Sequence, residues 1–216
     1  NLVSNPGFEA RAADGAPAAW RPRAPAQTID TNAPRSGTAC LRHDNADPAK
    51  YLLCTAPIRL EPGTRYEVSA WVRTSGVKGN DSGATVCLEW SDSAGRFMGG
   101  CYPKGIRGTS DGWQQVRGIS DSVPSNAARM TVSCYLWRGM TGTAWWDDLS
   151  VRPWLPPLLG TVTTDHYRQQ LTGGVVRVFA ALELEAHRVT PAAAAPVLCV
   201  RDARGTVWTS VPPCEV

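Results

Sequence analysis

The sequence predicts an all-β protein, and three observations support that prediction. Glycine and proline are frequent, with 20 and 17 residues in a chain of 216. Tryptophan is unusually common, with nine residues, whereas charged residues make up only 19% of the chain. Several segments alternate apolar and polar side chains, as strands with one buried face do. This combination is typical of many short strands joined by turns.

The expected strands can be placed in order along the chain. Residues 1–9 are expected to open the fold with a strand, and the Ala-, Pro-, Arg- and Gly-rich residues 10–34 should form an irregular excursion with one short strand. Alternation then predicts further strands over 38–43, 50–60, 66–73, 84–90, 128–137 and 143–151. In the strand over 66–73, the even-numbered residues should face the core and the odd-numbered ones should face away from it.

The turn Ser93-Ala94-Gly95 predicts a hairpin. A three-residue loop with glycine in the left-handed position would set Asp92 opposite Arg96, and Cys87 therefore opposite Cys101. A disulfide between Cys87 and Cys101 follows from that register. A bulge at the adjacent Gly99-Gly100 pair would break the register and the pairing.

The other cysteines also favour disulfides formed in an oxidising compartment, because no Cys-x-x-Cys motif is present. Cys40 and Cys54 flank a turn and form a second candidate pair. Cys134 lies on the apolar face of its strand and is predicted to be a buried free thiol. The pairing of Cys199 with Cys214 stays open.

Residues 143–151 carry two adjacent carboxylates, Asp147 and Asp148, inside a strand. Aspartate is depleted in strands, and a buried carboxylate needs a partner or a metal. Two interpretations therefore stay open: the pair lies in a solvated bulge, or one carboxylate helps to hold a structural cation. A similar element opens the chain, where a Pro-Gly turn leads directly to Phe8 and Glu9.

Together with segments 35–41, 60–73 and 111–116, these two elements come in an order that resembles the carbohydrate-binding modules of the family 4, 9 and 22 type. The resemblance covers residues 1–152. It implies a jelly-roll β-sandwich, a non-catalytic sugar-binding role and a structural calcium ion. Carried over by residue, the implied calcium ligands are the Glu9 side chain, the Gly7 carbonyl and the Asp148 side chain.

Sugar binding needs flat apolar rings on which pyranose rings stack, together with polar groups for the hydroxyls. Trp71, Tyr135 and Trp137 lie on the non-core faces of strands that a jelly roll places in one sheet. The side chains that share these faces and could orient sugar hydroxyls are Glu67, Arg73, Glu89 and Arg129, with Thr131 and Ser133. These residues resemble the groove of the family. The alternative for each ring is a structural role, covering a sheet edge or the second domain.

Residues 153–160 form a proline-rich hinge that cannot belong to a central strand. Beyond it, alternation predicts about four strands over 161–216, fewer than the about seven of a complete immunoglobulin-like sandwich. We therefore expect a jelly-roll module over 1–152, then a partial immunoglobulin-like β-sandwich. The second part resembles the linker domains of large secreted glycoside hydrolases.

Composition excludes several classes of function. A net charge of +3 without any Lys/Arg run argues against a nucleic-acid partner, and no apolar stretch is long enough to span a membrane. His43, His166 and His187 occur in no triad or metal pattern. Because successive strand residues point to opposite faces, Asp147 and Asp148 cannot act as a glycosidase pair. We therefore expect no catalysis by this chain.

The resulting prediction is a secreted, monomeric, non-catalytic module that holds an attached enzyme or surface protein against a polysaccharide. Xylan and β-glucan are the expected glycans, while Arg73 and Arg129 leave an acidic polysaccharide open. The alternative is a structural or adhesive β-sandwich of a large extracellular protein, without sugar binding. Fold alone does not separate these functions.

Overall fold

The computed structural model describes residues 1–79, 82–165, 177–187, 189–190, 198–201 and 207–210. The chain divides into two units, Asn1–Trp154 and Leu155–Val216. The regular elements of the described residues are all strands, and none of these residues forms a helix that could cross a membrane. The all-β prediction is therefore confirmed.

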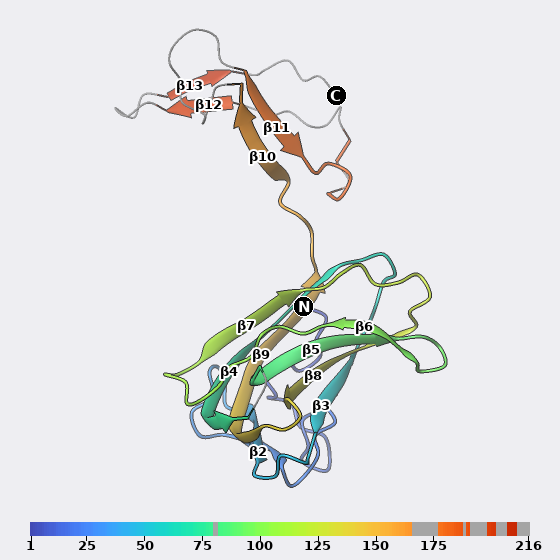
Figure 1. Cartoon of the computed structure of the whole chain (residues 1–216), viewed down its shortest axis with the longest axis vertical. Coiled ribbons are helices and arrows are strands. Elements are labelled where there is room, and N and C mark those ends of the chain that lie inside the picture. Colours follow the sequence, from blue (N-terminus) through green and yellow to red (C-terminus); the bar gives the residue numbers. More distant parts are fainter. Residues whose placement is uncertain (80–81, 166–176, 188, 191–197, 202–206, 211–216) are drawn as a thin grey trace. The chain divides into compact units, whose positions relative to one another are not determined.

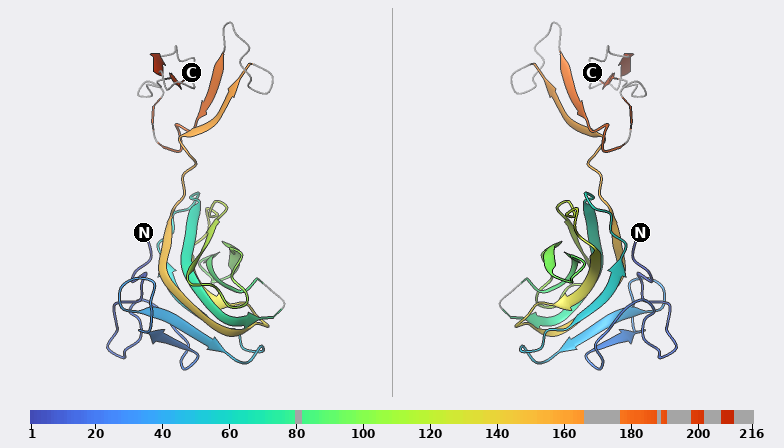
Figure 2. Two further views of the ribbon diagram at one scale, coloured as in Figure 1. Left: turned by 90° about the vertical axis from the view of Figure 1, so that its left-hand side faces the viewer. Right: turned by 90° about the vertical axis from the view of Figure 1, so that its right-hand side faces the viewer.

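The unit Asn1–Trp154 is a sandwich of two antiparallel sheets (Figure 1). The five-stranded sheet contains, in spatial order, β1 (Gln27–Asp30), β2 (Cys40–Asn45), β9 (Thr141–Pro153), β4 (Tyr66–Lys78) and β7 (Gln114–Ile119). The four-stranded sheet contains β3 (Leu53–Ile58), β8 (Arg129–Leu136), β5 (Ala84–Ser91) and β6 (Phe97–Cys101). The long strands β4 and β9 curve strongly in the side views (Figure 2).

The hydrophobic core lies between the two sheets. Val68, Ala70 and Val72 of β4 are buried there, as their alternation with polar neighbours predicts. Trp146 of β9 is fully buried, and its indole Nε1 donates a hydrogen bond of 3.0 Å to the Thr85 carbonyl on the opposite sheet. This bond satisfies the one polar atom of the largest core side chain and joins the two layers.

The opening segment differs from the prediction, because residues 1–9 form no strand. Asn5 and Phe8 have positive φ angles of 52° and 59°, which a strand does not tolerate. The segment is held to β9 by other bonds. The Leu2 amide donates to the Val151 carbonyl at 2.7 Å, and the Asn1 side chain both donates to the Leu149 carbonyl and accepts from the Val151 amide.

The predicted disulfide between Cys87 and Cys101 is wrong. The expected hairpin forms, with the Asp92 amide donating to the Arg96 carbonyl, but a bulge then shifts the register of β6. Leu88, not Cys87, therefore lies opposite Cys101. Since neighbouring strand residues point to opposite faces, Cys101 joins the core while Cys87 faces away from it.

The second predicted disulfide is also wrong. Cys40 pairs with Asp30 in the five-stranded sheet, whereas Cys54 pairs with Cys134 in the four-stranded sheet. The turn between β2 and β3 thus connects two sheets and is not a hairpin turn. Cys40, Cys54, Cys87, Cys101 and Cys134 are buried free thiols, as predicted for Cys134. Cys214 lies outside the described residues, so its pairing with Cys199 stays a prediction.

The unit Leu155–Val216 contains two hairpins in its described part. Strand β10 (Leu159–Thr164) pairs with β11 (Val178–Leu182), and β12 (Leu198–Arg201) pairs with β13 (Val207–Ser210). The β12–β13 hairpin confirms the two strands predicted near the end of the chain. The immunoglobulin-like fold stays a prediction, and His166 lies outside the described residues.

His43 of β2 is unusual because its imidazole points into the core. The side chain is 1% exposed, lies 6.3 Å from the ring of Trp146, and neither ring nitrogen has a hydrogen-bond partner among the described residues. Burial lowers the pKa of His43 to about 4, although the nearby Asp44 carboxylate acts in the opposite direction. The neutral imidazole is therefore the folded form.

This burial predicts a pH-dependent stability. The pKa of the unfolded histidine, about 6.5, lies above the folded value of about 4, so the unfolded chain binds the extra proton between these values. We expect the free energy of unfolding to fall by on the order of 3 kcal/mol as the pH drops through this window. Urea unfolding from pH 7 to pH 4 would measure it.

The matched variant is His43→Leu, which keeps an apolar side chain in the core and removes the titrating group. The difference in unfolding free energy between variant and wild type should grow in favour of the variant as the pH falls. A difference that stays constant from pH 7 to pH 4 would show that His43 does not titrate in this way.

Candidate functional site

The residues predicted to form one groove lie on two different sheets. Trp71, Arg73 and Glu67 belong to β4 of the five-stranded sheet, whereas the other predicted residues lie on or beside the four-stranded sheet. These others are Glu89 of β5, Arg129 and Tyr135 of β8, and Trp137 directly after β8. The placement in one sheet is therefore wrong. Alternation tells which face of a strand is buried, but not which sheet the strand joins.

On the outer face of the five-stranded sheet, tryptophan rings are covered by guanidinium groups. Arg42 of β2, Trp145 of β9 and Arg73 of β4 are cross-strand neighbours. The Arg73 guanidinium lies 4.5 Å from the Trp145 ring centre and 5.3 Å from that of Trp113, and Arg42 lies 5.7 Å from Trp145. We call this surface, with Arg35, Arg42 and Arg73, the arginine face.

Trp71 belongs to the arginine face as well. The Arg35 guanidinium lies 3.9 Å from its ring centre, a close cation–π contact. Arg35 also forms an ion pair with Asp148, so it is held in that position. The ring face that would have to receive a sugar is therefore already occupied, and Trp71 and Arg73 are better explained as structural residues.

Glu67 has a structural role on the same sheet. Its carboxylate, only 6% exposed, receives an ion pair from Arg117 and hydrogen bonds of 2.9 and 2.7 Å from Arg152. Burial by itself would raise the pKa of Glu67, but the hydrogen bonds from Arg152 and Arg117 lower it below its usual value. The side chain thus links β4 to β7 and β9 and has little capacity left for a ligand.

The outer face of the four-stranded sheet carries a cluster of four aromatic side chains, and we call it the aromatic face. Tyr135 lies 5.9 Å from Tyr51 and 5.8 Å from Trp137, measured between ring centres. Trp137 also lies 6.4 Å from Tyr51 and 6.5 Å from Tyr102, in edge-to-face arrangements. Among the described residues, no guanidinium covers Trp137.

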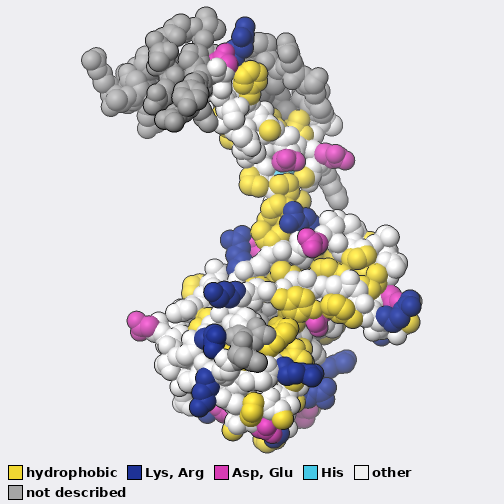
Figure 3. Space-filling view, viewed as in Figure 1, with side chains coloured by type: hydrophobic (Ala, Val, Ile, Leu, Met, Phe, Trp, Pro, Cys, Tyr) yellow, Lys and Arg dark blue, Asp and Glu magenta, His cyan; other side chains and the backbone are white. Residues whose placement is uncertain are grey.

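Apolar side chains form a band across the middle of this unit on the side where β5 and β6 lie (Figure 3). Tyr102 is 44% exposed and Phe97 is 66% exposed, and both lie at the ends of β6. Tyr51 and Tyr102 were missed in the sequence. A signal existed for Tyr51, because it continues the alternation of Leu53 and Thr55, whereas the bulge in β6 hides the orientation of Tyr102.

Polar groups lie directly beside these rings. The Tyr102 hydroxyl donates a hydrogen bond of 2.8 Å to Glu89. Below them, the buried hydroxyls of Ser133 and Tyr135 face the Cys87 thiol and bond to no oxygen or nitrogen among the described residues. Burial raises the pKa of Tyr51 to about 12, with a further contribution from Cys87 and Glu89. Aromatic rings beside the Glu89 carboxylate can bind a ligand that is both apolar and hydroxylated.

Arg129 lies on the aromatic face but near its end. Its side chain is exposed, and a β-carbon built on Gly95 would be 3.9 Å from one of its terminal nitrogens. The guanidinium therefore reaches toward the tip of the β5–β6 hairpin. Of the predicted groove residues, the structure brings Glu89, Tyr135 and Trp137 together, and it places Arg129 beside them.

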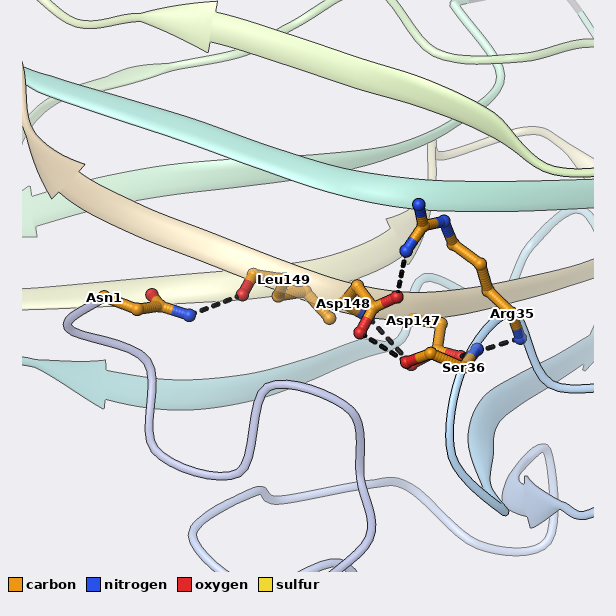
Figure 4. A network of polar contacts seen from close by, with 6 residues as sticks. All are labelled: Asn1, Arg35, Ser36, Asp147, Asp148 and Leu149. Atoms are coloured by element: carbon orange, nitrogen blue, oxygen red, sulfur yellow. Dashed lines mark hydrogen bonds and ion pairs between the residues drawn. The ribbon is translucent and has the colours of Figure 1, made fainter.

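The two carboxylates of β9 occupy a bulge, as one interpretation of the sequence expected, but only one of them is solvated. Asp148 has a positive φ of 47°, and the register between β9 and β4 shifts at this point. Asp147 is fully buried and accepts hydrogen bonds from the amides of Arg35, Ser36 and Asp148 at 2.8, 3.1 and 2.7 Å (Figure 4). Asp148 accepts from the Ser36 hydroxyl and pairs with Arg35.

The same region contains the predicted metal ligands. A β-carbon on Gly7 would lie 3.4 Å from Oδ1 of Asp147 and 3.8 Å from Oε1 of Glu9, so these oxygens converge over the glycine. Burial raises the pKa of Asp147, and Asp147 forms no ion pair with any described residue. Asp148, in contrast, is neutralised by Arg35. Asp147 and Glu9 are therefore better suited than Asp148 to coordinate a cation at this place.

Described residues form no cluster of three or more His, Cys, Asp or Glu side chains suited to a metal. A calcium ion in this place would therefore also need carbonyl or water oxygens, which calcium accepts readily. Hydrogen bonds from the Thr38 hydroxyl and from the Thr38 and Ala39 amides lower the pKa of Glu9, against the effect of burial. This keeps Glu9 ionised, as a metal ligand must be.

Comparisons with known proteins relate the first unit to carbohydrate-binding modules. The family model described as "Carbohydrate binding domain", for families 4 and 9, matches residues 1–95. No curated protein sequence matches the chain. The matched residues include the opening turn and strands β1 to β5, but not β8 and β9.

Solved structures share the fold at low sequence identity. A family 16 carbohydrate-binding module is 16% identical with a TM-score of 0.52, covering 70% of this chain and 99% of that one. An arabinose-bound α-L-arabinofuranosidase, MgGH51, is 18% identical with a TM-score of 0.54, covering 70% and 26%. The family 22 module and catalytic module of Clostridium thermocellum endo-1,4-β-D-xylanase 10B, complexed with xylohexaose, are 15% identical with a TM-score of 0.52, covering 70% and 28%.

This chain thus spans only about a quarter of the arabinofuranosidase and xylanase structures, and nearly all of the isolated module. At such identities the likeness extends to the fold alone. The first unit therefore has the sandwich fold of carbohydrate-binding modules, and its non-core faces decide what it can bind.

The structural role of Glu67 is testable with Glu67→Gln. Removing the charge leaves Arg117 and Arg152 without their shared partner, so we expect a loss of about 2 kcal/mol in the free energy of unfolding. Chemical denaturation at pH 7 would measure this loss. Glu61→Gln, at an exposed position without an ion pair among the described residues, is the control. Equal stability of both variants would mean that Glu67 is free for another role.

Proposed function

We propose that the unit Asn1–Trp154 is a non-catalytic carbohydrate-binding module of jelly-roll type that binds a polysaccharide on its aromatic face. The observation that carries this proposal is the cluster of Tyr51, Tyr102, Tyr135 and Trp137 beside the Glu89 carboxylate. The match of residues 1–95 to a carbohydrate-binding family supports it. So does the alternation of strands between the two sheets, which is consistent with a jelly roll.

The aromatic face is favoured over the arginine face for a physical reason. A pyranose ring stacks on a free aromatic surface, and the energy comes from desolvating both partners. On the arginine face the guanidinium groups already lie over the rings, and Arg35 and Arg42 are held there by ion pairs with carboxylates. On the aromatic face Trp137 can be reached without displacing a cation–π contact.

We further propose that the ligand is a β-linked polysaccharide such as xylan or β-glucan, and that the module tethers an attached secreted enzyme to it. The xylanase structure described above supports this arrangement, since it joins a family 22 module to a catalytic module in complex with xylohexaose. In this proposal the second unit is the linker between module and partner, and the chain acts outside the cell.

The proposed face can be tested by affinity gel electrophoresis against xylan and mixed-linkage β-glucan. Trp137→Ala should lose about tenfold or more in affinity, because it removes a central stacking ring. Trp71→Ala is the matched control, since it deletes a tryptophan on the arginine face. It should bind like wild type but lose about 1–2 kcal/mol of stability, because Arg35 loses its cation–π partner.

The opposite pattern, with binding lost in Trp71→Ala and kept in Trp137→Ala, would place the ligand on the arginine face. Failure of the wild type to be retarded by any neutral or acidic glycan would favour the structural or adhesive sandwich. Both variants should first be compared with wild type by circular dichroism, so that a loss of binding is not a loss of fold.

We also propose that the opening turn and β9 hold a calcium ion through Glu9, the Gly7 carbonyl and Asp147, with Asp147 replacing the Asp148 expected from the family pattern. Calcium should raise the melting temperature, and chelation should lower it, because a cation offsets the cost of the buried Asp147 charge. Differential scanning calorimetry and elemental analysis measure the two effects.

Asp147→Asn should abolish the calcium response, whereas Asp148→Asn should keep it. The two substitutions remove the same charge at neighbouring positions, so they separate the two assignments. A melting temperature that is indifferent to calcium and chelator in the wild type, with no metal found by elemental analysis, would rule out the site.

A further inference from the structure

Glu89 occupies the middle of the aromatic face. Its cross-strand neighbours are Thr131 on β8 and Gly100 on β6, and these side chains are short or absent. The Glu89 side chain is half-buried, and the short Thr131 leaves it open toward β8. On the β6 side it is bordered by Tyr102, a member of the aromatic cluster.

Tyr102 holds the Glu89 carboxylate in place. A β-carbon on Gly100 would come within 2.8 Å of the Tyr102 hydroxyl and 2.9 Å of its ring, so only glycine lets the ring lie across β6 toward Glu89. The hydroxyl then donates to one carboxylate oxygen at 2.8 Å. An ionised carboxylate has about four acceptor sites, so Glu89 keeps most of them for ligand hydroxyls.

The charge of Glu89 is not neutralised. Among the described residues it forms no ion pair, whereas Glu67, Asp148, Asp44 and Asp92 all do. Two cations on this side of the sandwich are turned to other groups. Arg129 reaches toward Gly95 at the hairpin tip, and Arg138 lies 5.3 Å from the centre of the Tyr51 ring.

We propose that Glu89 determines the specificity of this face, accepting hydrogen bonds from the hydroxyls of a neutral glycan and excluding sugars that carry a carboxylate. This inference rests on the proposed sugar binding. It adds that the preferred ligand is neutral and that Glu89 is the residue responsible for this preference. A carboxylate without an ion-pair partner, lying beside the bound sugar ring, would repel a uronate that bound at the same position. This repulsion weakens with salt. Tyr102 acts as the positioning residue of Glu89.

The test uses the full chain and two pairs of ligands, each with a neutral and an acidic form. The first pair is mixed-linkage β-glucan and the same glucan oxidised at C6 to the uronate. The second pair is xylan and glucuronoxylan. Dissociation constants are measured by affinity electrophoresis at low ionic strength, where screening is weak. The wild type should bind each acidic form about tenfold or more weakly than its neutral form, and added salt should narrow this ratio.

Glu89→Gln is the decisive variant. It keeps the shape of the side chain and removes the charge, so the acidic and neutral forms should bind within about threefold of each other, while neutral binding itself weakens. Tyr102→Phe should weaken neutral binding without admitting the uronate. Asp14→Asn, an exposed carboxylate in the turn before β1, is the control and should leave the ratio unchanged.

An unchanged acidic-to-neutral ratio in Glu89→Gln would overturn the proposal, and so would a wild type that prefers the acidic glycan. Either result leaves sugar binding itself intact. No binding of the wild type to any probe would instead overturn the proposed function. The melting temperature of Glu89→Gln should equal that of wild type, because no ion pair is lost.

Discussion

The carboxylate of Asp147 is fully buried in β9, and it can be so only because three backbone amides point at it. Two of these amides belong to Arg35 and Ser36, so the loop before β2 must close over the bulge. Closure brings the Arg35 side chain to Asp148 and onto the ring of Trp71. The hydrogen bonds that bury Asp147 thus place Arg35 over the Trp71 ring.

The outer faces of the two sheets therefore differ in how their charged and aromatic side chains are paired. On the arginine face, guanidinium groups cover the tryptophan rings, and Arg35 and Arg42 also pair with carboxylates, which stabilises this face. On the aromatic face, rings contact rings, and the Glu89 carboxylate forms no ion pair among the described residues. In the proposed function the sandwich therefore separates stability and recognition between its two sheets, and a binding residue can be changed without removing an ion pair.

Much of the fold could be predicted from the sequence, because alternation reports burial directly. The faces of β4, β5 and β8, the β5–β6 hairpin and the buried thiol of Cys134 all followed from it. The sheet to which each strand belongs could not be predicted in this way. Trp71 and Trp137 alternate with their neighbours in the same manner, yet they belong to opposite sheets. The register of β6 was predicted wrongly because a one-residue bulge places Cys101 opposite Leu88 instead of Cys87. Tyr102 was missed for the same reason. The sequence could not tell which of Asp147 and Asp148 is buried, because the amides that bind Asp147 come from a distant loop.

The bulge in β6 has a further consequence for the behaviour of the protein in solution. β6 is the edge of the four-stranded sheet, and Phe97 at its start is exposed. Such an edge is a template for pairing with the same strand of a second molecule. The bulge interrupts the regular ladder, and the Tyr102 ring lies over Gly100, so both features oppose the pairing of this edge with a second molecule.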